Sequence, residues 1–96
     1  MHLKAEVVFH SGGRRHLPVS GYRPDAVFDG FQEYWGIVFV ELKATQFDTP
    51  SRATIAFTFS DSHYLDAAPH QGFRIMEGAR EVGCGKVLSI ETQNLL

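Results

Sequence analysis

The sequence predicts an all-β domain, folded as a small closed antiparallel barrel. Short apolar stretches alternate with polar residues at the two-residue period of half-buried strands, and no window shows the period of a helix. Gly83 and Gly85 interrupt the last of these stretches, and glycine inside a strand typically marks a bulge or a bend where a sheet curls. Closing such a curled sheet into a barrel removes its exposed edges.

Three strands are predicted in the first half of the chain. Residues 3–9 alternate apolar and polar side chains and end at a Ser-Gly-Gly turn. The stretch that follows is irregular, because Pro18 and Pro24 cannot donate a hydrogen bond to a neighbouring strand. Residues 25–28 form a short strand that an Asp-Gly turn ends. Residues 35–42 are aromatic and β-branched, which favours a central strand.

The next predicted strand covers residues 54–59. Residues 47–52 before it contain Asp, Thr, Pro and Ser in succession, a composition typical of a loop. Within residues 54–59 the alternation places Ile55, Phe57 and Phe59 on one face of the strand.

The chain is predicted to end in a hairpin after a polar connection. The arms begin with residues 75–77 and 80–82, and Gly78 and Ala79 lie between them. Glycine at the first central position suits a two-residue type II′ turn, whose twist matches that of the flanking strands. The second arm continues to Ile90, which brings the predicted total to six strands.

Size and composition restrict the class of protein. A chain of 96 residues predicts one domain over residues 1–96, and 44% hydrophobic content argues against disorder. The net charge of −2 supplies no basic field that would attract nucleic acid. The single cysteine, Cys84, excludes an internal disulfide. Neither a membrane-spanning run nor a signal peptide is evident, so we expect a cytoplasmic protein without a membrane partner.

Motifs near both ends of the chain match one known family. Near the start, Glu-Val stands at residues 6–7, Gly-Gly-Arg at 12–14 and Gly-Tyr-Arg-Pro at 21–24. Near the end, residues 77–83 read Glu-Gly-Ala-Arg-Glu-Val-Gly. In this order and over nearly its whole length, the chain resembles the C-terminal β-barrel domain of elongation factor Tu. The resemblance implies a six-stranded, Greek-key-like barrel, which we expect here as a stand-alone protein.

The resemblance also implies a contact surface. In the family, the segments that carry these motifs lie on or near the surface that meets the T-stem of tRNA. Transferred by motif, the candidate contact residues are Arg14, Tyr22, Arg23, Glu77 and Gly78. We add Arg15 and Arg80, because the planar guanidinium of arginine binds phosphate and carboxylate groups through paired hydrogen bonds.

Departures from the family pattern weaken the expectation of RNA binding. Arg15 stands where the family has histidine, Asp25 replaces a glutamine, and Glu81 replaces a threonine. A carboxylate at a phosphate-facing position repels the RNA backbone. We therefore expect a non-catalytic binding module with a protein partner, for which the translation apparatus is one source. A tRNA or rRNA stem remains the alternative partner.

Three aromatic residues suggest a further part of the contact surface. Phe31, Tyr34 and Trp35 cluster in a loop and at the start of a strand. Aromatic side chains are enriched at the energetic centres of protein interfaces. We therefore include these three residues among the candidate partner contacts.

Nucleotide binding and GTP hydrolysis are not expected. Full-length elongation factors hydrolyse GTP in a separate P-loop domain, and the nearest match here is Gly85-Lys86. A P-loop would need glycine in place of Arg80 and a hydroxyl residue in place of Val87.

Catalytic and metal sites are also weakly supported. Asp61, Ser62 and His63 have the side chains of a hydrolase triad, but neighbouring residues rarely line up as one, and turn chemistry explains them better. A small hydrolase is therefore the weakest hypothesis. The metal candidates, which lack the tight spacing of ligand pairs, are His10, His16, His63 and His70, with Asp61 or Asp66. We expect no cofactor, no metal and no catalytic residue, and we interpret Cys84 as a packing residue.

Overall fold

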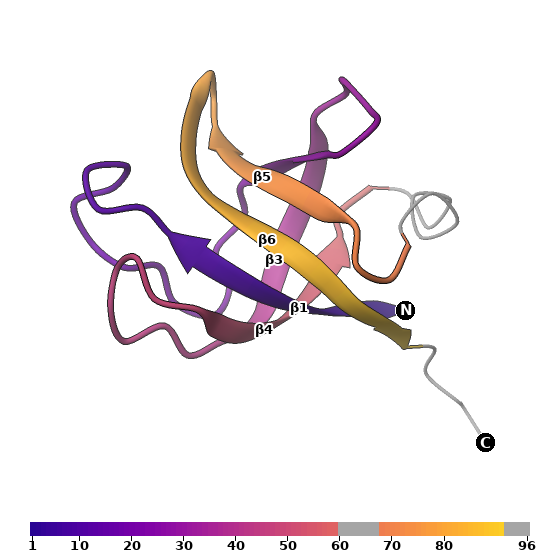
Figure 1. Ribbon diagram of the computed structural model, residues 1–96, viewed down its shortest axis with the longest axis horizontal. Helices are drawn as coiled ribbons and strands as arrows, with labels where there is room; N and C mark the ends of the chain where they lie inside the picture. The colour runs from indigo at the N-terminus through magenta and orange to yellow at the C-terminus, as the bar shows by residue number, and fades with distance from the viewer. Residues whose placement is uncertain (60–67, 92–96) are drawn as a thin grey trace.

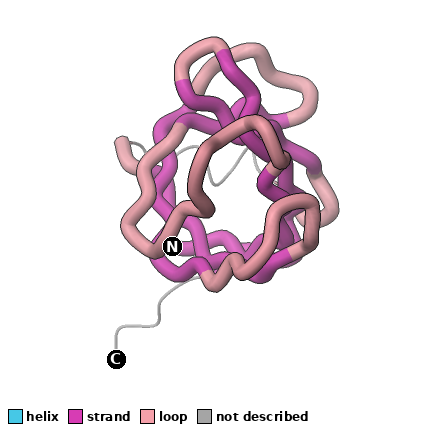
Figure 2. Tube along the Cα trace, turned by 90° about the vertical axis from the view of Figure 1, so that its left-hand side faces the viewer, coloured by secondary structure: helices cyan, strands magenta, loops and turns pink. Residues whose placement is uncertain are grey.

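Six strands close into an antiparallel barrel in the computed structural model of the protein, which describes residues 1–59 and 68–91 (Figure 1). The strands are β1 (His2–Phe9), β2 (Asp25–Phe28), β3 (Trp35–Leu42), β4 (Ser51–Phe57), β5 (Gly72–Glu77) and β6 (Arg80–Glu91). The described residues contain no helix, and Figure 2 shows their strands arranged as a ring. The all-β closed barrel of six strands predicted from the sequence is confirmed.

The strand order around the barrel is β1-β4-β3-β2-β5-β6. Strands β2, β3 and β4 follow one another along the chain and lie side by side. The first strand, β1, pairs with β4 and not with β2, the strand that follows it in the chain. This is a Greek-key arrangement, in which one long connection lets a strand pair outside its own hairpin. The long connection here is formed by residues 10–24, between β1 and β2.

The alternation of β1 produces one wall of the core. Leu3, Ala5, Val7 and Phe9 are buried, whereas the residues between them are partly exposed. An aromatic group fills the interior around Phe28, whose ring centroid lies 5.0 Å from that of Phe73. Burial of these large rings supplies much of the hydrophobic stabilisation of a small barrel.

Strand β6 bends where the sequence places its glycines. The register against β5 pairs Ile75 with Gly83 and Met76 with Glu81, so Val82 is an extra residue in a bulge. A Cβ added to Gly83 would lie 2.5 Å from the carbonyl oxygen of Val8 on β1. Glycine is required because only a residue without a Cβ permits this close approach of two backbones.

Two details of β4 differ from the prediction. The strand begins at Ser51, earlier than expected, because Ser51 and Arg52 pair with Val7 and Glu6 of β1. The prediction that the strand extends to Phe59, with this residue on the same face as Ile55 and Phe57, is wrong. Strand β4 ends at Phe57, and the Phe59 side chain is 87% exposed and lies against Gly36 on the outside of the barrel.

The two ends of the barrel carry different residues. We call the rim the end where β1 and β5 finish and β6 begins; it includes residues 10–24 and the turn at Gly78 and Ala79. We call the base the opposite end, where residues 29–34 connect β2 to β3. Because neighbouring strands are antiparallel, the motifs from both ends of the chain meet at the rim.

Candidate functional site

Four of the predicted contact residues meet at the rim around one carboxylate. Glu77 ends β5, and its Oε2 atom accepts a hydrogen bond from the Tyr22 hydroxyl at 2.5 Å and forms an ion pair with Arg14 Nε at 2.8 Å. Its Oε1 atom accepts from Nη2 of Arg80 at 3.4 Å. We refer to Arg14, Tyr22, Glu77 and Arg80 as the Glu77 cluster. Its members come from three separate segments of the chain.

Backbone pairing positions Tyr22 in this cluster. Just before β2 begins, the chain already runs alongside β3, with Gly21 N donating to Phe39 O at 2.7 Å and Phe39 N donating to Tyr22 O at 2.8 Å. Successive side chains along an extended chain point to opposite sides. The Tyr22 ring therefore packs inward against Phe9 and Phe39, with centroids 6.1 and 5.6 Å away, while Arg23 is exposed.

The guanidinium of Arg14 is held in a defined plane. It lies 4.6 Å from the centroid of the Tyr22 ring, and Nη1 donates to the backbone oxygen of His16 at 3.1 Å. Such cation–π contacts contribute about 0.5–1 kcal/mol at exposed sites. With Nε bound to Glu77, the remaining Nη hydrogens of Arg14 are the groups that a partner could use. The cluster is thus organised before any partner binds.

The contacts shift the pKa values of both acids in the cluster. Burial alone would raise the pKa of Glu77, but the Tyr22 hydrogen bond and the charges of Arg14 and Arg80 outweigh it, so that this pKa is lowered. Burial, followed by the hydrogen bond to Glu77, raises the pKa of Tyr22 far above its ordinary value. At neutral pH, Glu77 is therefore ionised and Tyr22 keeps its proton, which suits their hydrogen bond.

A Glu77→Gln substitution is expected to destabilise the fold in a pH-dependent way. At neutral pH we expect a loss of about 1.5 kcal/mol, the lower end of the range for hydrogen bonds to a charged group, because the Glu77 side chain is partly exposed. Because the folded pKa is lowered, the contribution of Glu77 is present above its ordinary pKa of 4.5 and is lost as the pH falls through the folded value. Urea unfolding of both proteins between pH 3 and 8 should therefore show curves that converge in acid.

The matched control for this experiment is Glu41→Gln. Glu41 is exposed on β3 and forms no ion pair with another described residue. The control should differ little from wild type across the same range. A Glu77→Gln loss that stays constant down to pH 3 would contradict the assigned role of the carboxylate.

The other predicted rim residues surround the cluster. Arg15 and Arg23 are exposed, and neither forms an ion pair with any residue in the described ranges. Gly78 is exposed and has a φ of +61°, as a type II′ turn requires at its first central position. Residues 10–24 contain three arginines and no carboxylate, so this loop is locally basic although the whole chain is acidic.

The nearby acidic groups already have partners on the protein. Glu81 Oε2 lies 3.0 Å from His10 Nε2, and Asp48 Oδ1 accepts a hydrogen bond from the Ser11 backbone at 3.1 Å. Hydrogen bonds from Ser11 lower the pKa of Asp48, which keeps it ionised. These carboxylates partly offset the basic loop, so the rim as a whole is not strongly positive.

The aromatic part of the predicted contact surface lies at the base, away from the Glu77 cluster. Trp35 is only 8% exposed and packs in the core against Phe28, Phe31 and Phe57, with centroids 5.5, 5.0 and 5.9 Å away. Its prediction as a surface contact is wrong, because Trp35 occupies the first inward-facing position of β3. Phe31 is half-buried, and Tyr34 is 49% exposed.

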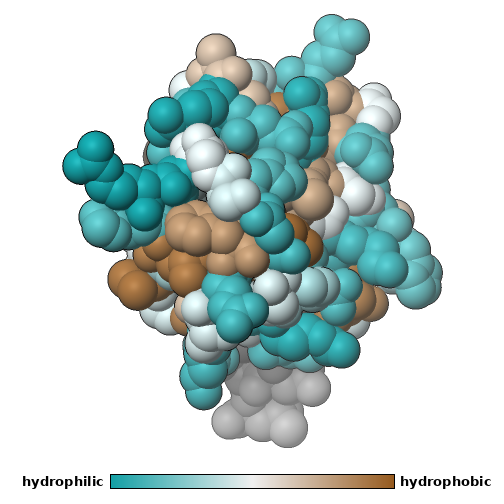
Figure 3. Space-filling view, turned by 60° about the vertical axis from the view of Figure 1, so that its left-hand side comes forward, coloured by the Kyte–Doolittle hydropathy of each residue, from teal (hydrophilic) through white to brown (hydrophobic). Residues whose placement is uncertain are grey.

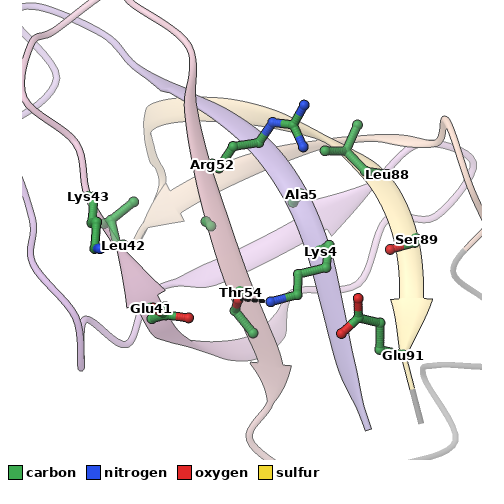
Figure 4. A pocket seen from close by; sticks show the side chains of 11 residues that line it. Lys4, Ala5, Glu41, Leu42, Lys43, Arg52, Thr54, Leu88, Ser89 and Glu91 are labelled. Atoms are coloured by element: carbon green, nitrogen blue, oxygen red, sulfur yellow. Dashed lines mark hydrogen bonds between the residues drawn. The ribbon is translucent and has the colours of Figure 1, made fainter.

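A groove lies on the outer face of the barrel, and the sequence did not indicate it. This groove of about 530 Å³ crosses β1 and β4, and its charged lining residues are Lys4, Glu41, Lys43, Arg52 and Glu91 (Figure 4). At its floor, Lys4 Nζ donates to the hydroxyl of the buried Thr54 at 2.8 Å. The Arg52 guanidinium lies apart from Lys4, so the cations do not converge on one point (Figure 4).

The residues considered for catalysis and metal binding have different outcomes. Asp61, Ser62, His63 and Asp66 lie outside the described residues. Within residues 1–59 and 68–91, no three His, Cys, Asp or Glu side chains are placed to hold one metal ion. Cys84 is half-buried, and burial together with the nearby Glu81 raises its pKa, which favours the unreactive thiol.

Similarity to known proteins adds no family assignment. No protein-family model matches the sequence, and no curated protein matches it either.

The described part of the chain contains no helix that is long and apolar enough to cross a membrane.

Proposed function

We propose that this protein is a non-catalytic binding module of the cytoplasm that binds a protein partner through its rim. The observation that carries the proposal is the convergence of Arg14, Tyr22, Glu77 and Arg80 from three segments into one cluster held by ion pairs and hydrogen bonds. Side chains held in place before binding lose less conformational entropy when a partner docks. The two exposed arginines beside them, Arg15 and Arg23, extend this surface.

The composition of the rim supports a protein partner. Arginine and tyrosine are the residue types most enriched at interface hot spots, and the partner would supply carboxylates to the guanidinium groups. The acidic groups Glu77, Glu81 and Asp48 at the same end reduce the attraction for a polyanion. The motifs that resemble the C-terminal barrel of elongation factor Tu make the translation apparatus the first place to search.

RNA binding is the second candidate function, and the basic loop favours it. Residues 10–24 carry Arg14, Arg15 and Arg23 without a carboxylate. Such a loop could contact the phosphates of an RNA stem, with a steep dependence on salt.

The test is affinity capture from the native cell with the wild type and with an Arg15→Gln, Arg23→Gln double variant. Both side chains are exposed and unpaired among the described residues, so the fold should be unaffected. We expect at least a tenfold loss of the captured protein, which corresponds to about 1.4 kcal/mol. The control is an Arg74→Gln, Lys86→Gln double variant, which removes the same charge from exposed positions on β5 and β6.

The same experiment separates the two candidates. Equal capture by the two double variants would contradict the rim as the binding surface. A captured protein that survives nuclease treatment supports the leading proposal. Nuclease-sensitive capture, with tRNA binding at 50 mM salt that weakens by 200 mM, would instead support RNA.

A further inference from the structure

A shallow pocket lies beside the Glu77 cluster on the rim. It has a volume of about 410 Å³ and is lined by Arg14 and residues 17–22. Figure 3 brings the rim side of the barrel forward and shows an apolar area there, surrounded by hydrophilic side chains. We call this hollow the rim pocket.

The backbone of the rim pocket is fixed to the barrel. The hydroxyl of Ser20 accepts a hydrogen bond from Leu42 N at 3.0 Å, and Gly21 N donates to Phe39 O at 2.7 Å. Tyr22 N closes a turn by donating to Val19 O at 3.1 Å. The pocket is therefore formed in the absence of a ligand, which lowers the entropic cost of filling it.

The walls combine apolar and cationic groups. Leu17, Pro18 and Val19 supply aliphatic surface, and the Val19 side chain is 72% exposed at the lip. Arg14 also lines the pocket; its guanidinium lies over the Tyr22 ring and has Nη hydrogens available for an acceptor. An exposed aliphatic residue beside a held arginine suits a ligand that has an apolar group next to a carboxylate.

We propose that the rim pocket binds a short acidic segment of a partner protein, in which an aliphatic side chain is flanked by aspartate or glutamate. This inference rests on the proposed function and specifies the partner. The aliphatic side chain contacts Leu17 and Val19, and a flanking carboxylate accepts hydrogen bonds from Arg14, which lines the pocket. The exposed Arg15 and Arg23 belong to the same loop and add positive charge near the pocket. The aliphatic wall favours peptide over RNA, because a sugar–phosphate backbone offers no matching apolar side chain.

The test is a titration of isotope-labelled protein, followed by backbone amide NMR, with the capped pentapeptide Asp-Glu-Leu-Asp-Asp. We expect saturable shifts of the amides of Val19, Ser20 and Gly21. Two matched peptides, one with serine in place of leucine and one with Asn and Gln in place of the acids, should bind at least fivefold more weakly. No saturable shift at millimolar peptide, or equal binding of the serine peptide, would overturn the proposal.

Two protein variants test whether the peptide binds at the rim pocket. Val19→Asp should abolish the shifts without affecting folding, because Val19 is exposed. Phe59→Asp makes the same apolar-to-acidic change at an exposed position near the base and should leave peptide binding unchanged. Equal loss with both variants would also overturn the proposal.

Two further outcomes keep this inference distinct from the function on which it rests. If the peptide fails but the Arg15→Gln, Arg23→Gln variant still loses its protein partner, the pocket assignment is wrong and the rim function stands. If a short RNA duplex, and not the peptide, shifts the amides of residues 19–21, the ligand is RNA and the proposal is overturned.

Discussion

Replacing Phe28 with alanine is expected to lower the free energy of unfolding by about 3–5 kcal/mol, the usual cost of removing a buried phenylalanine ring. Phe28 is 1% exposed, and its ring lies 5.0 Å from Phe73, 5.5 Å from Trp35 and 5.7 Å from Phe57, measured between centroids. The substitution would leave a cavity among three rings that come from three other strands. Such a loss is a large part of the roughly 5–15 kcal/mol that stabilises a typical domain.

The matched control is Phe59→Ala, which makes the same chemical change on the outside of the barrel. Phe59 is 87% exposed, so we expect a change within about 0.5 kcal/mol. Urea unfolding followed by the fluorescence of Trp35, the single tryptophan, measures both variants. Similar losses for the two variants would mean that Phe28 does not occupy the centre of the core.

Trp35 packs against Phe28 in the same core. A Trp35→Ala substitution would therefore change the stability of the fold and would not measure partner binding.

Replacing Gly83 with alanine is expected to destabilise the barrel by about 1–3 kcal/mol or more, the range for overpacking a close contact. The added Cβ would lie 2.5 Å from the carbonyl oxygen of Val8 and 3.3 Å from the Cα of Phe9. Both atoms belong to the backbone of β1, so no side-chain rotation relieves the overlap. Strands β1 and β6 pair along the whole of β1, and this pairing completes the barrel.

Gly36→Ala is the control for this prediction. Its added Cβ would lie 3.1 Å from the ring of Phe59, an exposed side chain that can move. Alanine within a strand also loses less conformational entropy on folding than glycine, so we expect little change or a slight stabilisation. The same unfolding assay applies. A Gly83→Ala protein as stable as the Gly36→Ala protein would show that β1 and β6 are not as close as described.

Local patterns predicted most strands well. The bounds of β2 and β3 match their predicted ranges, and β1 starts one residue earlier than predicted, because alternation and turn residues act over a few neighbouring positions. The prediction failed at the ends of β4. The start of β4 depends on pairing with β1, more than forty residues away in sequence. The outward position of Phe59, just after β4 ends, depends on Trp35 filling the interior beside Phe57.

The candidate site was predicted in part. Arg14, Tyr22 and Glu77 were selected through motifs that resemble the elongation factor barrel, and Arg80 was selected for its guanidinium group. Their mutual contacts were not foreseen. The rim pocket was missed altogether. Its signal was the Leu-Pro-Val sequence at residues 17–19, an apolar group inside an irregular stretch where no strand would bury it.

The local pattern of apolar, polar and turn residues along the chain was enough to predict an all-β fold, the inward face of β1 and the tight turn at Gly78. The three-dimensional arrangement was needed to learn that Glu77 binds Arg14 and Tyr22, and that Trp35 belongs to the core. The reason is that alternation specifies which side chains share a face of one strand, whereas contacts between strands depend on pairing order and register. Those are set by the free energy of closing the whole barrel, to which residues far apart in sequence contribute together.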